Sequence, residues 1–171
     1  NKYDGFQKQH RNSIFDLEAD HTLFTLQNGS GKGVMLQLIS QLMLPGTAWG
    51  KRNGNKLAGM FYDRYQVFQP YTFHVLLEWR LDGKEDQKLL AGICVSAHKQ
   101  QSTSDQEGKV GLKYFLYTHQ YQGRSRFGLE NLPLYTRSSD QVLEYDKLEE
   151  FIDQNRQDFM KFSKTAVSSL N

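Results

Sequence analysis

The sequence predicts an α+β fold in which an apolar helix and a polar helical segment accompany an antiparallel sheet. A glycine-rich turn runs into an apolar helical pattern at residues 33–44. Strand-like runs follow at residues 71–80, 87–97 and 112–121, and residues 140–170 carry a polar helical pattern. Because the strand-like runs are consecutive and are joined by polar turns, they indicate an antiparallel meander rather than repeated βα units.

Two short strands are expected before the glycine-rich turn. Ser13–Glu18 and His21–Leu26 alternate their side chains with the period of a β-strand. The helix that follows, from Gly33, is apolar over most of its circumference, so we expect it to be buried under a sheet. Pro45 and Gly46 are expected to end it.

The middle of the chain predicts three or four strands joined by hairpins. Residues 71–80 and 87–97 are separated by the turn-rich connector Asp82–Asp86. A third strand is expected at residues 112–121, and the run Phe127–Tyr135 is the candidate for a fourth.

The segment from Asp140 to Leu170 is expected to be helical and to lead away from the sheet. Its apolar residues form an irregular amphipathic stripe made of Leu143, Leu148, Phe151, Ile152, Phe159 and Phe162.

A phosphate-binding loop is predicted at Asn28–Lys32, between the second strand and the helix. In the general pattern G-x-x-x-x-G-K-[ST], Gly31 and Lys32 match. Leu26 stands at the first glycine position, and Gly33 stands at the hydroxyl position. The start of a helix favours anions because its N–H groups are free and its dipole is positive there.

If ATP binds at this loop, Lys32 contacts the β- and γ-phosphates and Asn28 shapes the loop. The backbone N–H groups expected to line the anion belong to Gly29, Ser30, Gly31, Lys32, Gly33 and Val34. The alternative is a turn that only joins a strand to a helix, for which one glycine with a positive φ is enough.

The segment Asn28-Gly-Ser-Gly-Lys32 resembles the loop of the ABC/SMC class of ATPases. The order of the predicted elements is similar to the N-terminal part of an SMC-type head. Val34–Pro45, Trp49–Lys51 and Met60–Asp63 resemble bacterial SMC-like proteins of the chromosome-partition or plasmid-defence type. The resemblance implies a P-loop NTPase fold, the N-terminal lobe of an ABC/SMC head, with the last helix leading towards a coiled-coil arm.

The same resemblance implies the cofactors ATP and Mg²⁺ and four kinds of partner. These are the C-terminal half of the same head, a second head in a homodimer, DNA and accessory subunits. Neither the family's L-S-G-G signature nor an apolar strand ending in Asp-Glu occurs in the sequence, so no catalytic residue is assigned. Residues 1–171 are interpreted as a single domain and as a fragment of a longer protein.

Gly33 raises a question about the metal, because the family has a serine or threonine there whose hydroxyl helps to hold Mg²⁺. The family's glutamine that bridges Mg²⁺ has no clear counterpart, and Gln154 and Gln157 are positional guesses, whose alternative is an exposed helix position.

Four cations are candidates for DNA contact by analogy with the upper surface of SMC-type heads: Lys51, Arg52, Lys56 and Arg64. The alternative is a solvated loop. Trp49 can stack on a base or fill a hydrophobic gap. His74, His98 and His119 lie on separate runs without the spacing of a zinc site, so we interpret them as core or surface residues.

Size and composition are those of one globular domain. The chain has 171 residues, a formal charge of +2 and 38% hydrophobic residues. The longest apolar run is too short for the about 20 residues that cross a bilayer, so no membrane partner is expected. With a single cysteine, Cys94, and no targeting segment, a cytoplasmic location is predicted.

The leading hypothesis is the ATP-binding N-terminal half of an SMC-like head whose dimerisation acts on DNA. The alternative is a degenerate nucleotide-binding or structural interaction module without hydrolysis, since Gly33 lacks the hydroxyl. A small P-loop kinase or GTPase is disfavoured because a β-meander follows the first helix.

Overall fold

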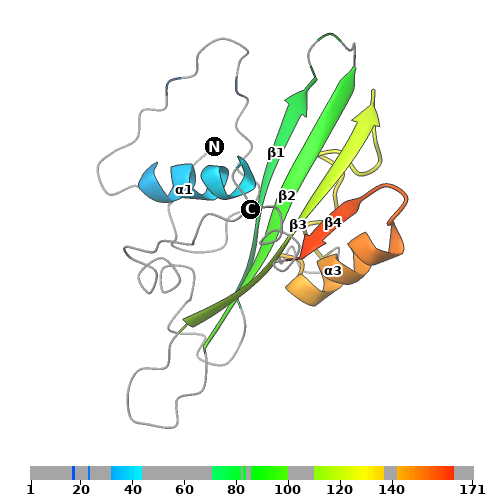
Figure 1. Cartoon of the computed structure of the whole chain (residues 1–171). Helices are drawn as coiled ribbons and strands as arrows, with labels where there is room; N and C mark the ends of the chain where they lie inside the picture. Colours follow the sequence, from blue (N-terminus) through cyan, green and yellow to red (C-terminus); the bar gives the residue numbers. More distant parts are fainter. Residues whose placement is uncertain are drawn as a thin grey trace, which may run out of the picture.

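The computed structural model describes residues 17, 23, 32–43, 71–81, 83, 86–99, 110–136 and 142–163. In chain order the elements are α1 (Lys32–Met43), β1 (Tyr71–Arg80), β2 (Gln87–Lys99), β3 (Val110–Gln122), α3 (Tyr145–Gln154) and β4 (Met160–Ser163). Figure 1 shows the strands as one twisted sheet, with α1 beside β1 and α3 beside β3 and β4.

The four strands follow the order β1-β2-β3-β4, and each neighbouring pair is antiparallel. The three strands predicted between residues 71 and 121 are therefore present. The β1–β2 hairpin closes with the N–H of Leu81 donating to the carbonyl of Gln87 at 2.9 Å. Gly83 and Asp86 have φ values of 70° and 62° in the connection. Glycine adopts this backbone readily and aspartate tolerates it, so the turn has residues that suit its geometry.

Strand β2 is buried on both faces of the sheet, because every residue from Leu90 to Ala97 is buried. Successive side chains of a strand point to opposite faces. Leu90 and Cys94 accordingly pack with the core on the α3 side, while Ile93 and Val95 pack with the core on the α1 side. Burial on both faces explains why this strand is an almost continuous apolar run.

The α3 side of the sheet holds the larger core. Helix α3 buries Tyr145, Leu148 and Ile152, which share one face at helical spacing. The rings of Phe115 and Tyr145 meet edge to face, with centroids 5.0 Å apart. The remaining buried members of this core are Leu90, Cys94, Tyr117, Phe127, Leu132, Leu134 and Phe159.

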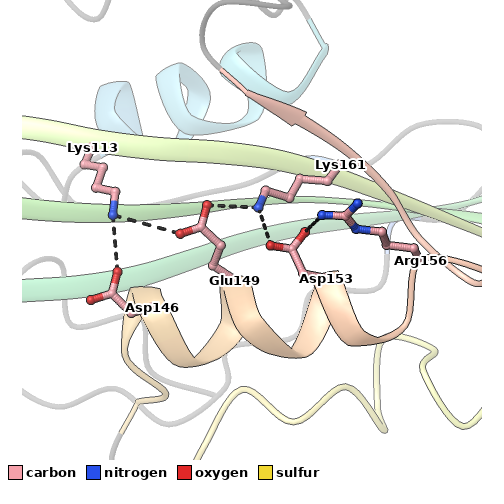
Figure 2. Close-up of polar contacts among 6 residues, drawn as sticks. All are labelled: Lys113, Asp146, Glu149, Asp153, Arg156 and Lys161. Carbon is pink, nitrogen blue, oxygen red and sulfur yellow. Dashed lines mark hydrogen bonds and ion pairs between the residues drawn. The ribbon is translucent and has the colours of Figure 1, made fainter.

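A row of acids on α3 ties the helix to β3 and β4 (Figure 2). Asp146 lies 3.2 Å from Lys113 Nζ, and Lys161 Nζ lies 3.0 Å from Glu149 and 2.9 Å from Asp153. The hydrogen bond from Lys161 holds the pKa of Asp153 below its usual value. Such partly exposed pairs contribute at most about 1 kcal/mol each, so the row orients α3 more than it stabilises the fold.

Helix α1 packs on the opposite face of the sheet through one side only. Leu42 is buried against Ile93, Val95 and Leu116. The side chains of Leu36 and Met43 are 61% and 60% exposed. The prediction of a buried helix is therefore wrong for this outer side of α1. Within the described ranges a single sheet contacts the helix, and a sheet covers only one side of it.

The expectation of a strand at Phe127–Tyr135 is wrong. This segment turns locally, with the N–H groups of Asn131 and Leu132 donating to the carbonyl of Gly128 at 3.0 Å. Its one β-type contact is an isolated bridge between Tyr135 and Val142. The fourth strand of the sheet is β4 instead, because the apolar residues after β3 cover the α3 side rather than extend it.

The expectation of a helix over residues 140–171 is confirmed for residues 145–154, which form α3, and is wrong for residues 155–163, which do not continue the helix outward. Helix α3 ends at Gln154, and Asn155 donates its side-chain N–H to the Phe151 carbonyl at 2.8 Å. The chain then turns back and adds β4 to β3. Phe159 packs on the α3 side and Phe162 on the α1 side, so the two rings never belonged to one helical stripe.

Of the two strands expected before the loop, the structure describes only Leu17 and Leu23. Neither residue is in a helix or strand, and their side chains are 54% and 87% exposed. The rest of both predicted strands lies outside the described residues.

The close approach of Tyr117 to Gly92 predicts a strict requirement for glycine in the middle of β2. A Cβ on Gly92 would overlap the ring of Tyr117, its cross-strand neighbour. We expect Gly92→Ala to lower the free energy of unfolding by about 2 kcal/mol or more, measured by urea denaturation. Tyr117→Phe is the matched control. The hydroxyl of Tyr117 is buried without a partner among the described residues, so its removal should change stability by less than about 1 kcal/mol. Full stability of Gly92→Ala would contradict this packing.

Candidate nucleotide-binding site

The candidate site lies at the N-terminal end of α1. The helix begins at Lys32, and the N–H groups of its first turn have no acceptors within the helix. These N–H groups and the positive end of the helix dipole favour an anion. No acidic residue occurs in this first turn, so no fixed negative charge on it opposes a phosphate.

The structure brings three of the predicted site residues together. Lys32, Gly33 and Val34 are the first three residues of α1, and their backbone N–H groups are consecutive at its start. The other predicted loop residues, Asn28, Gly29, Ser30 and Gly31, lie outside the described residues. Gly33, where the sequence predicted the helix to begin, is helical, and the phosphate-binding loop before it stays a prediction.

The sheet supports α1 from its C-terminal half. Gln41 and Leu42 are the buried residues of this helix for which side-chain burial is described. Leu42 rests on Ile93 and Val95, which belong to the strand that is buried on both faces. The C-terminal end of α1 is thus packed on the central strand β2, and this contact positions the N-terminal end of the same helix.

The structure separates the guessed glutamines from this site. Gln154 is the last residue of α3, is exposed and donates to Glu150 at 3.2 Å. Gln157 is exposed in the following turn. Helix α3 packs on the face of the sheet opposite to α1 (Figure 1), so the sheet lies between these glutamines and Lys32. Both positional guesses are wrong, since the alternation of strand residues puts the two helices on opposite faces.

The residues predicted to contact DNA, Lys51, Arg52, Lys56 and Arg64, lie outside the described residues, as does Trp49. Among the residues that the structure describes, no group of three or more His, Cys, Asp or Glu side chains is placed to hold a metal ion.

Two of the histidines are held by backbone carbonyls. His74 of β1 donates from Nε2 to the carbonyl of Leu143 at 3.0 Å, while its Nδ1 is buried without a partner among the described residues. Burial lowers the pKa of His74 to about 4, so the ring is neutral near pH 7. Nδ1 of His119 donates to the carbonyl of Asp158 at 2.6 Å, and its Nε2 accepts from Ser125 at 2.8 Å. Each ring therefore connects a strand of the sheet to a segment outside it: His74 connects β1 to Leu143, and His119 connects β3 to Asp158.

Glu78 of β1 is the centre of a cluster of polar contacts that the sequence pattern did not predict. Its carboxylate accepts hydrogen bonds from the hydroxyl of Tyr121 and from the N–H of Leu129, and Lys88 Nζ lies 3.5 Å away. Burial, followed by the hydrogen bond to Glu78, raises the pKa of Tyr121 above its usual range. The strand register brings these residues together, and a single strand pattern cannot reveal it.

Comparison with known proteins gave no match: no family model, no curated protein and no solved structure is significantly similar to this chain. Among the described helices, none combines the length and the apolar character that crossing a bilayer requires.

The lowered pKa of His74 predicts a loss of stability in mild acid. The unfolded chain binds a proton near pH 6.5, whereas the folded chain binds it only near pH 4. Stability from this residue is complete above pH 6.5 and falls by about 3 kcal/mol as the pH decreases to about 4. Urea denaturation at a series of pH values measures this slope. His74→Gln keeps a donor for Leu143 but does not titrate, so its curve should be flatter in this window. Equal slopes for both proteins would contradict the assignment.

Proposed function

We propose that this chain is the ATP-binding N-terminal half of an SMC-like ATPase head. In such a head, ATP bound between two heads favours their association, and the associated heads act on DNA in chromosome or plasmid maintenance, repair or defence. The observation that carries the proposal is the start of α1 at Lys32, directly after Asn28-Gly-Ser-Gly. The antiparallel sheet after this helix adds support, because it matches the element order that the resemblance requires.

The chemistry of the site follows from its donors. The consecutive N–H groups of Lys32, Gly33 and Val34 suit the oxygens of a phosphate, and the ammonium of Lys32 supplies the charge that balances them. With neither signature nor acidic strand in the sequence, the chain binds and orients the nucleotide but does not by itself complete a hydrolytic centre. The C-terminal half of the head, a second head and accessory subunits complete the assembly in this proposal.

Loss of the Lys32 charge should weaken ATP binding. A charge-assisted hydrogen bond contributes about 1.5–3 kcal/mol, so we expect Lys32→Ala to raise the Kd for ATP by about 10-fold to 100-fold in calorimetric titration. Lys147→Ala is the matched control. Lys147 is an exposed lysine on α3, 67% exposed and 3.9 Å from Glu150, on the far side of the sheet. If both variants bind ATP like the native chain, the phosphate-binding loop is refuted.

The proposal also assigns DNA phosphates to Lys51, Arg52, Lys56 and Arg64. Each cation that neutralises a phosphate contributes about 0.9 to the slope of log K against log salt. We expect the fourfold alanine variant to lose most of its affinity for duplex DNA of any sequence and to have a smaller slope, measured by fluorescence anisotropy at several salt concentrations. Alanine at two exposed cations, Lys147 of α3 and Arg156 of the turn that follows α3, is the control. An unchanged slope in the fourfold variant would mean that these four cations do not contact DNA and belong to a solvent-exposed loop.

A further inference from the structure

Ser125 and His119 form a hydrogen-bonded pair at the end of β3. His119 belongs to this strand, and Ser125 lies in the segment that follows it. The Oγ of Ser125 lies 2.8 Å from Nε2 of His119. The other ring nitrogen, Nδ1, lies 2.6 Å from the carbonyl oxygen of Asp158. A serine, an imidazole and a third group that orients the imidazole are the arrangement that activates a nucleophile.

The carbonyl of Asp158 determines which nitrogen of the neutral His119 ring carries the proton. A carbonyl oxygen only accepts hydrogen bonds, so Nδ1 is the protonated nitrogen. Nε2 is then the acceptor, and the hydroxyl of Ser125 donates to it. In this state Nε2 can take up the Oγ proton, which is the task of a general base. The opposite tautomer would have no lone pair at Nε2 for that proton.

The surroundings of His119 hold its ring in place. The side chain is buried. The ring of Tyr121 stacks on it with centroids 5.1 Å apart, and the ring of Phe159 lies at 5.0 Å. Two aromatic neighbours and a backbone carbonyl therefore fix the direction of Nε2 towards Ser125. Because the base is already oriented, little conformational freedom is lost when a substrate binds.

The segment around Ser125 keeps the hydroxyl partly exposed and favours negative charge on it. Ser125 is only partly buried, and the N–H of Phe127 donates to its Oγ at 3.1 Å. A donor to this oxygen stabilises the alkoxide relative to the hydroxyl. The guanidinium of Arg126 is exposed and lies 3.6 Å from the Asp158 carboxylate and 4.5 Å from the centroid of the Phe127 ring. These contacts keep a cation next to Ser125, where it attracts a negatively charged substrate.

We propose that Ser125 is a nucleophile that accepts acyl groups from negatively charged esters, with His119 as its general base. As Oγ attacks the ester carbonyl, an Oγ–C bond forms and the Oγ–H proton moves to Nε2. When the tetrahedral intermediate collapses, the C–O bond to the alcohol breaks and the proton leaves with the alcohol. The products are an acyl-serine and a free alcohol, and no further reactant is needed.

This activity does not depend on the proposed nucleotide site. The ring of His119 contacts Phe127 and Phe159, which belong to the core on the α3 side of the sheet. Helix α1 packs on the opposite face. Failure of one proposal therefore leaves the other standing.

The test is acylation of the full 171-residue chain by two esters, neutral para-nitrophenyl acetate and anionic para-nitrophenyl succinate, with peptide mass spectrometry to locate the acyl group. Ser40 is the matched control in the same molecule. It is exposed, and its Oγ donates at 2.8 Å to the carbonyl of Leu36, which cannot take up the proton. A general base accelerates such a step by about 100-fold or more, so we expect Ser125 to react about 100-fold faster than Ser40. The excess should be larger with the succinate ester and should disappear when urea unfolds the chain.

His119→Gln keeps a side chain that can form hydrogen bonds but removes the base. We expect it to slow acylation of Ser125 by about 100-fold. Equal rates at Ser125 and Ser40 in the native chain would overturn the inference, and so would an unchanged rate at Ser125 in a folded His119→Gln variant. Equal reaction with the two esters would overturn the assignment of a negatively charged substrate. If circular dichroism shows that His119→Gln is unfolded, the comparison of Ser125 with Ser40 in the native chain still decides.

Discussion

Burial of β2 on both faces is the constraint on which the rest of this structure depends. From Leu90 to Ala97 every residue is covered, so the strand needs a layer on each side and a paired strand at each edge. One layer is α3 with the turns that follow β3, and the other includes α1. Gly92 allows this close packing, because Tyr117 lies where its side chain would be.

The two layers differ in how completely they are closed. On the α3 side, Leu148 and Ile152 are fully buried and a row of ion pairs covers the rim (Figure 2). On the α1 side, Leu42 reaches the sheet while Leu36 and Met43 remain exposed on the outer side of the helix. The closed side stabilises the domain. The more open side holds α1, whose first turn has N–H groups without acceptors inside the helix.

The elements that could be predicted from the sequence are those that depend on side-chain periodicity and turn residues within one segment of the chain. The period of two identified β1, β2 and β3, and the apolar run after the glycine-lysine turn identified the helix α1. The predictions that failed needed tertiary information. The spacing of Phe159 and Phe162 fits an amphipathic helix, but the two side chains pack on opposite faces of the sheet. The group around Glu78 depends on strand register, and the separation of Gln154 from Lys32 depends on which face each helix covers.

The central claim is that backbone N–H groups around the start of α1 bind phosphate. Amide chemical shifts report on these N–H groups directly. The most direct measurement is a two-dimensional amide NMR titration with ATP, in which the glycine signals are separate from the others. The amides of Gly29, Gly31 and Gly33 should shift and saturate together, while those of Gly92 and Gly128, which pack against Tyr117 and Tyr121, should stay in place. Saturable shifts elsewhere, with Gly29, Gly31 and Gly33 unchanged, would contradict a phosphate-binding loop at this helix.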